Sequence, residues 1–322
     1  MIKVLHITPH LSGGVGAVLL ETLKYYADES DYDHKIVAFE ELLDAELRYF
    51  SDFHNSITNT NDYDEIKSLV LNADIVHVEW WTHPLIYLFL FKFRFPKCRL
   101  LVCSHIAGFH RPNLITKNIL EIPDVFLATT SATLEIELLR QDENTSLKAN
   151  ISVVNYPLNF ERFSGYRRTE TKQFRIGYVG TLDYAKLHRE FLSMTSRINI
   201  PEKIIIVGGK DIENRLEHEA LSYPDVDFRF TGFVENVVEL YEQMDVFGYP
   251  LNPKHFGTGE QALREAMFVG LPIVAFDNFC EREIIENGVT GLLVRNVEEY
   301  IAAIELLYQD KSLRERLGRN SK

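Results

Sequence analysis

Residues 255–275 carry the side chains whose types and spacing are best suited to chemistry. A Gly-rich loop leads into a segment of helical period, expected at about residues 259–268, and Pro272 then starts a β-rich run at 273–276. In α/β proteins a loop, a helix N-terminus and a buried strand in this order present backbone N–H groups to an anion. Glu265 would lie one turn into the helix, where it can reach a hydroxyl while the N–H groups hold a phosphate.

A plainer interpretation of the same helix stays open. Glu260 and Arg264 have the i,i+4 spacing of a surface ion pair, and Glu265 could be a solvated helix residue. The helix alone does not decide between these interpretations, so the elements that would position it must be considered.

The composition bounds the class of protein. The 322 residues suggest two domains, and 46% hydrophobic with 25% charged residues is ordinary for a soluble globular chain. A net charge of −13 argues against a nucleic-acid partner. The three cysteines form no CxxC motif and favour a reducing, cytoplasmic environment. The first eight residues are expected to form a strand and not a signal peptide, and no apolar window reaches membrane-span length.

Apolar runs of strand length alternate with segments of helical period along the chain. Strands are expected at 4–8, 34–39, 74–78, 100–104 and 125–128, and again at 152–154, 174–179, 203–207, 227–230 and 246–249. Helices are expected at 63–71, 186–196, 211–221, 237–241 and 297–307. Strands that are apolar throughout predict parallel sheets covered on both faces.

This pattern predicts an α/β fold with two doubly wound, Rossmann-like domains facing each other across a cleft. We expect an N-terminal domain at 1–155, a linker at 156–172 and a C-terminal domain at 173–322. Gly-containing loops follow the first strand of each domain, at 12–16 and 177–181. Neither has the GxGxxG spacing, and the GxxxxGK[ST] loop is absent. A nucleotide would therefore be held by loops from both domains.

Taken together, the motifs resemble those of the family-four (group 1) retaining glycosyltransferases, which have the GT-B fold. The resemblance covers nearly the whole chain. It rests on the Gly-rich loop after the first strand, DIVHVEW at 74–80, Ser104-His105, VVNYP at 153–157, GYVG at 177–180 followed by Lys186, TGFV at 231–234, Asp245-Val246 leading to Tyr249-Pro250, residues 263–275, and GVTGLLV at 288–294.

The resemblance implies a transferase that moves a sugar from a nucleotide diphosphate donor, with retention at the anomeric carbon and without a metal or cofactor. Lys186 matches the family's diphosphate lysine, and Glu265 matches the glutamate that accepts hydrogen bonds from the ribose. His105 matches the histidine that stabilises positive character near the reacting sugar. A core or capping histidine is the alternative for His105, and His77 is expected to be structural.

The same resemblance implies a set of donor-binding positions. They comprise glycines that allow close approach to phosphates, a backbone position beside the base, and N–H groups at the helix N-terminus. These positions are Gly13, Gly14, Gly180, Thr181, Val234, Thr258, Gly259 and Glu260.

Three departures from the family pattern stand out. Thr181 occupies a position where the family usually has Arg, and Gly257 replaces the glutamate expected eight residues before Glu265. Glu260 could turn inward as a substitute for that glutamate. The chain also ends soon after the helix at 297–307, without the family's usual crossover helix.

The acceptor side is less clear. Residues 84–95 join many apolar side chains to a local group of basic residues. This segment is either a buried helix that covers the sheet or a point of peripheral membrane contact. Aromatic and basic residues that could line an acceptor groove are Trp80, Trp81, His110 and Arg111.

The sequence thus favours a retaining, metal-independent hexosyltransferase acting on a glycan or lipid-linked acceptor in cell-envelope polysaccharide synthesis. A catalytically impaired scaffold or regulatory protein on the GT-B fold is the alternative, because Thr181 and Gly257 replace key groups. A nucleotide-sugar epimerase is a further option. The predicted location is the cytoplasm, and no oligomeric state is indicated.

Overall fold

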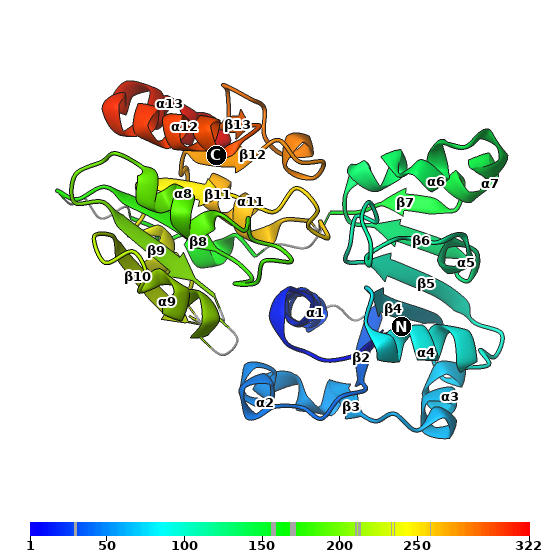
Figure 1. Ribbon diagram of the computed structural model, residues 1–322. Coiled ribbons are helices and arrows are strands. Elements are labelled where there is room, and N and C mark those ends of the chain that lie inside the picture. Colours follow the sequence, from blue (N-terminus) through cyan, green and yellow to red (C-terminus); the bar gives the residue numbers. More distant parts are fainter. Residues whose placement is uncertain are drawn as a thin grey trace. The chain divides into compact units, whose positions relative to one another are not determined.

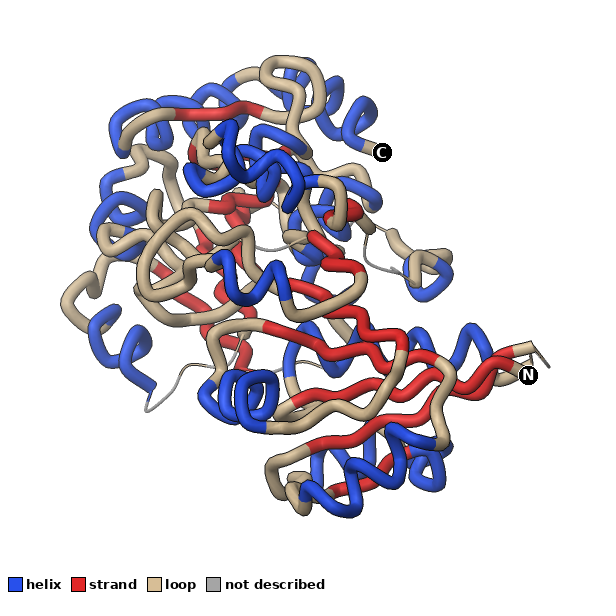
Figure 2. Tube along the Cα trace, turned by 90° about the vertical axis from the view of Figure 1, so that its right-hand side faces the viewer, coloured by secondary structure: helices blue, strands red, loops and turns tan. Residues whose placement is uncertain are grey.

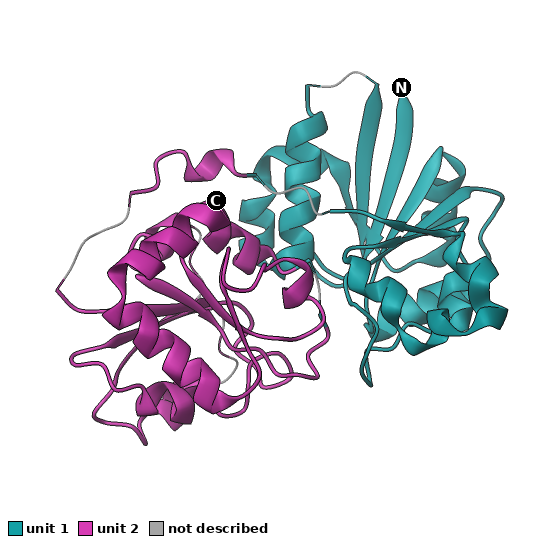
Figure 3. Cartoon of the chain, turned by 90° about the horizontal axis from the view of Figure 1, so that it is seen from above, with its two compact units in different colours: residues 1–159, 257–259 teal, residues 160–256, 260–322 magenta. Residues whose placement is uncertain are grey.

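The computed structural model describes residues 1–28, 31–155, 159–167, 172–209, 211, 214–232, 234, 236–257 and 259–322. The chain forms two compact units (Figure 3). Unit 1 comprises residues 1–159 with 257–259, and unit 2 comprises 160–256 with 260–322. Each unit has its own parallel sheet.

Unit 1 is built on a seven-stranded sheet with the order β3-β2-β1-β4-β5-β6-β7. Helix α1 lies on one face of this sheet and α4 on the other (Figure 1). The elements are β1 (Ile2–Thr8), α1 (Gly13–Tyr26), β2 (Tyr32–Ala38), α2 (Asp44–Tyr49), β3 (Ile57–Asn59), α3 (Tyr63–Leu71), β4 (Ile75–Trp80), α4 (Pro84–Lys92), β5 (Arg99–Ser104), α5 (Lys117–Glu121), β6 (Val125–Ala128), α6 (Glu137–Arg140), α7 (Thr145–Lys148) and β7 (Ile151–Val153).

Unit 2 is built on a six-stranded sheet with the order β10-β9-β8-β11-β12-β13. Strands and helices alternate along the chain from β8 to β12. Figure 2 shows the strands of the structure in red and its helices in blue. The elements are β8 (Arg175–Val179), α8 (Phe191–Arg197), β9 (Ile204–Gly208), α9 (Arg215–Ala220), β10 (Asp227–Gly232), α10 (Val238–Tyr241), β11 (Val246–Tyr249), α11 (Gln261–Phe268), β12 (Ile273–Phe276), β13 (Leu292–Val294), α12 (Val297–Gln309) and α13 (Lys311–Ser321).

The sequence pattern explains why these elements form. β9 and β12 are buried at every position, because both faces of their sheet are covered. Helix α1 follows β1 closely, and a Cβ on Gly16 would lie 1.6 Å from the carbonyl oxygen of Leu11. Only glycine allows this approach, which brings Leu19 and Leu23 of α1 into a cluster with Ile36 of β2.

Helix α8 begins later than the sequence predicts. The helix expected from residue 186 starts at Phe191, so Lys186 lies in a turn. The Asp183 side chain accepts a hydrogen bond from the Ala185 N–H at 2.6 Å, and Leu187 forms a bridge with Leu251. These contacts hold the segment in an extended or turn conformation until α8 begins.

Helix α4 covers the sheet of unit 1, as one of the two interpretations of this segment expects. Ile86, Phe89 and Leu90 are buried, whereas Leu88 and Phe91 are exposed. In the part of the chain that the structure describes, no helix has the length and apolar character needed to span a membrane.

Candidate active site

Lys186 is a buried cation of unit 2. Its backbone N–H donates to the Asp183 carbonyl at 2.9 Å, and its own carbonyl accepts from Asn252 N–H at 2.7 Å. The side chain ends with Nζ at 3.2 Å from Oε2 of Glu260 and lies near the rings of Tyr249 and Phe256. An ammonium in this setting is fixed in place by its anion and by aromatic faces.

Glu260 is fully buried, so the surface position that its i,i+4 spacing from Arg264 suggests is wrong. Helix α11 begins only at Gln261, so Glu260 is the N-cap and not a residue of the exposed helix surface. Its φ of +46° places it in the left-handed region, which is rare for a non-glycine residue. The side chain turns inward, where it accepts a hydrogen bond from the Tyr249 hydroxyl and pairs with Lys186.

A second buried acid–base pair adjoins Glu260. His255 Nε2 lies 3.2 Å from Oε1 of Glu281, and His255 Nδ1 lies 4.0 Å from Glu260. Burial alone would lower the pKa of His255, but the two carboxylates outweigh burial and leave that pKa raised. The buried group around Lys186 therefore contains two carboxylates and one histidine that favours its charged form.

Glu265 is buried and not solvated, so the plain interpretation of its helix position is wrong. Its carboxylate pairs with Arg162 and accepts hydrogen bonds from Gln261 Nε2 at 2.9 Å and from the Tyr241 hydroxyl at 3.1 Å. Burial raises the pKa of Glu265, and Arg162 opposes that shift only in part. Arg162 was not predicted from the sequence, because it lies 103 residues from Glu265.

The remaining predicted donor positions are distributed over both units. In unit 2, a Cβ on Gly180 would lie 2.6 Å from the Tyr178 hydroxyl, while Thr181 is exposed and Val234 half-buried. Gly13 and Gly14 form the exposed first turn of α1 in unit 1. Gly259 groups with unit 1, and Thr258 lies outside the described residues.

His105 lies directly after β5 in unit 1 and is buried. Its Nε2 lies 2.7 Å from Oε2 of Glu79, and its backbone N–H donates to the Trp80 carbonyl at 2.8 Å. Burial would raise the pKa of Glu79, but His77, His105 and His6 together hold it well below its ordinary value. Glu79 was missed at the sequence level, although a carboxylate within an apolar strand is a signal that could have revealed it.

The four predicted acceptor residues have different surroundings. Trp80 is fully buried among Tyr87 and Phe126, so it is a core residue and does not line a groove. Strand residues alternate between faces, and Trp80 therefore points away from the face that carries Glu79. Trp81 is half-buried beside the rings of His10, His83 and His105. His110 is half-buried and Arg111 exposed.

Three groups of side chains among the described residues offer ligand atoms close enough together for a metal ion. Two of them share Glu79, and both of its carboxylate oxygens already lie within hydrogen-bond distance of imidazole nitrogens. The groups are His6, His77 and Glu79; His10, Glu40 and His83; and Glu79, Cys103 and His105.

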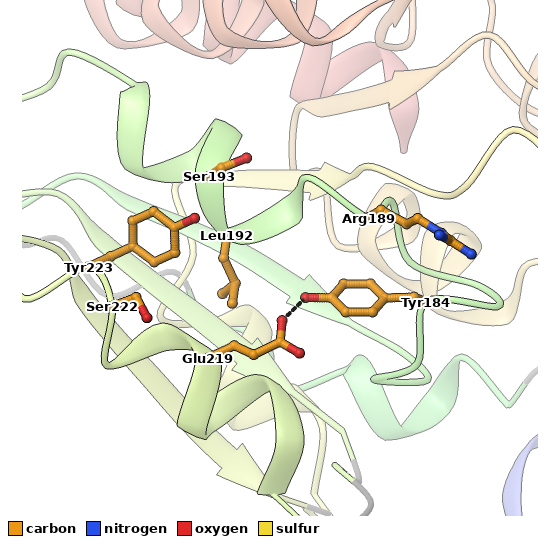
Figure 4. A pocket seen from close by; sticks show the side chains of 7 residues that line it. All are labelled: Tyr184, Arg189, Leu192, Ser193, Glu219, Ser222 and Tyr223. Atoms are coloured by element: carbon orange, nitrogen blue, oxygen red, sulfur yellow. Dashed lines mark hydrogen bonds between the residues drawn. The ribbon is translucent and has the colours of Figure 1, made fainter.

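A small polar pocket in unit 2 has a volume of about 210 Å³ (Figure 4). Ligand pockets for molecules of drug size occupy roughly 300–1,000 Å³. The Tyr184 hydroxyl donates to Glu219 on one side of it. The pocket is lined by Tyr184, Arg189, Leu192, Ser193, Glu219, Ser222 and Tyr223. None of these is a predicted site residue, and the pocket is too small for a nucleotide sugar.

Several solved structures align with this chain over 99–100% of its length. Anabaena HepE in complex with UDP-glucose is 16% identical, with a TM-score of 0.77 over 100% of this chain and 93% of that one. A glycosyltransferase from Rickettsia africae is 15% identical, with a TM-score of 0.75 over 99% and 92%. Sucrose-phosphate synthase from Thermosynechococcus elongatus is 14% identical, with a TM-score of 0.71 over 100% and 93%. The fold is GT-B, two Rossmann-like α/β units.

Sequence comparison gives the family. No curated protein matches the sequence. The model for the family described as glycosyl transferases group 1 matches residues 160–322, which is just over half of the chain. The chain therefore belongs to the group 1 glycosyl transferases.

Proposed function

We propose that the protein is a retaining, metal-independent glycosyltransferase that moves a hexose from a nucleotide diphosphate sugar to a glycan or lipid-linked acceptor. The acceptor hydroxyl oxygen forms the new bond to the anomeric carbon as the bond from that carbon to the diphosphate breaks. The hydroxyl proton leaves with the departing phosphate or to solvent. Family membership supports the transfer reaction, and the setting of Lys186 supports its mechanism.

Lys186 is the residue that carries the proposal. Negative charge builds on the diphosphate as it leaves, and a preorganised cation stabilises that charge best. The Lys186 ammonium is buried and held at 3.2 Å from Glu260, so it is already oriented before a donor binds. A fixed ammonium supplies the charge that a metal would otherwise provide, and we therefore propose a metal-independent reaction.

Glu265 and Arg162 form the second part of the proposed donor site. We propose that the Glu265 carboxylate accepts hydrogen bonds from the ribose hydroxyls. Arg162 and the Tyr241 hydroxyl hold this carboxylate in place for the contact. The raised pKa of Glu265 follows from burial, and Arg162 favours the ionised form that accepts hydrogen bonds. The donor-binding roles of Gly13, Gly14, Gly180, Thr181, Val234, Thr258 and Gly259 are part of the same proposal.

Glu260 has a different role in this proposal from the one its position suggests. A glutamate that substitutes for the missing carboxylate at Gly257 would contact a sugar hydroxyl. Glu260 is fully buried and engaged by Lys186 and Tyr249. We propose that it orients Lys186, and that the sugar is selected by other groups.

The acceptor and cellular role are inferred from unit 1 and from the compared proteins. We propose that His105 lies beside the reacting sugar and that Trp81, His110 and Arg111 contact the acceptor. WaaG, a glycosyltransferase involved in lipopolysaccharide biosynthesis, has the same fold, with a TM-score of 0.67 at 12% identity. This likeness is in line with the envelope glycan synthesis that we propose for the chain. We further propose that the protein acts in the cytoplasm and contacts the membrane peripherally through the basic residues at and after the end of α4, which are Lys92, Arg94, Lys97 and Arg99.

The test is a donor-hydrolysis and transfer assay begun with UDP-glucose, because HepE was solved with that compound. Wild-type protein should release UDP slowly without acceptor and faster with one, should give a product of the donor's anomeric configuration by NMR, and should keep its rate in EDTA. Lys186→Ala should lose turnover. An inverted product, or a rate that requires added metal, would refute the corresponding part of the proposal.

A catalytically impaired scaffold is the second candidate, and the Lys186–Glu260 pair is the observation that favours it. Glu260 neutralises the charge that a diphosphate would need. Such a protein would bind a nucleotide weakly and turn over none of a panel of nucleotide sugars, whereas the enzyme should turn over at least one.

A further inference from the structure

One face of the unit 1 sheet carries a row of polar side chains beneath α1. The strand registers pair His6 of β1 with His77 of β4, and Glu79 of β4 with Cys103 of β5. Residues paired in this way, and residues two apart on one strand, point to the same face. The neighbouring strand β2 adds His34, whose ring stacks on Tyr26 of α1 with centroids 4.5 Å apart.

Three of these side chains, those of His34, His6 and Glu79, form a continuous chain of hydrogen bonds that ends at His105. His34 Nδ1 lies 2.9 Å from His6 Nε2, and His6 Nδ1 lies 3.0 Å from Oε1 of Glu79. The other oxygen of Glu79 lies 2.7 Å from His105 Nε2. Glu79 therefore bridges two buried imidazoles with one oxygen for each.

The direction of each hydrogen bond follows from the charges. An ionised carboxylate only accepts, so His6 donates from Nδ1 and His105 donates from Nε2. If the His6 ring carries one proton, that proton is on Nδ1, so Nε2 accepts and His34 donates from Nδ1. The remaining nitrogen of His34, Nε2, is buried and has no hydrogen-bond partner among the residues that the structure describes. This nitrogen is then an acceptor that receives no hydrogen bond, and burying it costs less free energy than burying an N–H without an acceptor.

A buried glutamate is expensive at this position. Desolvation of an ionised group costs several kcal/mol, and an apolar side chain of similar size is often as stable or more stable. The bridging geometry of Glu79 therefore indicates a role other than stabilising the fold. Glu79 holds the ring of His105, the histidine that the proposed function places beside the reacting sugar.

We propose that Glu79 is a positioning residue that holds the His105 ring in one orientation with its proton on Nε2, and that His6, backed by His34, holds Glu79. This inference rests on the proposed role of His105. Two other contacts also hold His105. Its backbone N–H donates to the Trp80 carbonyl, and its ring centroid lies 5.8 Å from that of Trp81. Glu79 itself does not touch substrate in this proposal.

The test combines kinetics with the NMR signals of histidine ring nitrogens. In wild-type protein labelled with ¹⁵N-histidine, His105 should carry its proton on Nε2. In Glu79→Gln the His105 tautomer or ring environment should change, and kcat should fall by up to about 100-fold, since a small misplacement of a group near the reacting atoms can cost that much. The KM for the donor should change by less than about twofold.

Two further variants make the kinetics specific. The double variant Glu79→Gln with His105→Ala should be no slower than His105→Ala alone, because Glu79 acts only through His105. Glu46→Gln is the matched control, since Glu46 is another buried glutamate of unit 1 that accepts a hydrogen bond from the Leu43 N–H. It should leave the signals of His105 and kcat unchanged.

Several results would overturn the proposal. A wild-type His105 with its proton on Nδ1, or additive losses in the double variant, would do so directly. Stoichiometric metal in the purified wild type that is absent from Glu79→Gln would make Glu79 a metal ligand instead. Full activity in His105→Ala would refute the proposed role of His105, and the NMR result would still decide whether Glu79 orients that ring.

Discussion

The ammonium nitrogen of Lys186 lies 3.2 Å from Oε2 of Glu260, and both side chains are buried within unit 2. Removing one partner of a buried ion pair leaves the other charge without compensation in a poor solvent for ions. A substitution at Lys186 therefore has two consequences, one on folding and one on turnover, and an experiment must separate them.

Lys186→Ala should lower turnover by about 100-fold or more, because a preorganised group that stabilises transition-state charge contributes on that scale. The same variant should lose about 3 kcal/mol of unfolding free energy, since the buried Glu260 carboxylate loses its ammonium partner. The double variant Lys186→Met with Glu260→Gln removes both charges and should recover much of that stability while turnover stays low. Urea unfolding and the UDP-release assay measure the two effects. Recovery of turnover in the double variant would show that Lys186 acts only in folding.

Glu265→Gln should weaken binding of a nucleoside diphosphate by about tenfold or more. The substitution replaces an ionised hydrogen-bond acceptor with a neutral one, and hydrogen bonds to charged groups contribute about 1.5–3 kcal/mol. Isothermal titration calorimetry with UDP measures the change. Glu298→Gln is the matched control, because Glu298 pairs with Arg197 at 2.6 Å on the surface and should have no effect on UDP affinity. Equal affinities in wild type and Glu265→Gln would contradict the proposed ribose contact.

Acid should destabilise unit 1 through its neutral histidines. Burial, the largest cause, lowers the pKa of His77 from 6.5 to about 4, and it has the same effect on His34. The unfolded chain therefore binds more protons than the folded chain between pH 6.5 and 4. The unfolding free energy that the two neutral histidines contribute is fully present above pH 6.5 and is lost as the pH falls toward 4.

The loss attributable to His77 between pH 6.5 and 5 should be about 2 kcal/mol. The partly exposed His34 should contribute less. Glu79, whose pKa lies well below its ordinary value, acts in the same direction only at lower pH. Urea unfolding at pH 7, 6 and 5 measures the slope, and His77→Gln should flatten it. An unchanged slope in that variant would show that His77 is not the group responsible.

Local patterns in the sequence predicted much of the fold because they reflect local physics. The strand expected at 273–276 matches β12, since an apolar run that begins just after Pro272 has few alternatives. The start of the helix predicted at residue 186 was wrong by five residues, because the bridge from Leu187 to Leu251 is a tertiary contact between segments far apart in the chain. Local propensity does not contain such contacts.

The same distinction between local pattern and tertiary contact applies to the candidate site. Glu265 and Lys186 could be named from spacing and resemblance, but their partners could not. Arg162 and Glu260 acquire their roles only when the chain brings them against Glu265 and Lys186. Trp80 was within reach of sequence reasoning, because the period of two along β4 places it on the opposite face from Glu79.

The neighbouring residues Trp80 and Trp81 should respond in opposite ways to substitution. Trp80→Ala empties a fully buried site and should lower the unfolding free energy by about 3–5 kcal/mol, with Trp80→Phe less severe. Trp81 is half-buried, so Trp81→Ala should cost much less stability. If Trp81 stacks on the acceptor, this variant should raise the acceptor KM several-fold and leave the donor KM unchanged, because the aromatic face that binds the sugar is lost. Thermal unfolding and initial rates with each substrate varied in turn measure both effects. A rise in the donor KM alone, or no change in either, would remove Trp81 from the acceptor site.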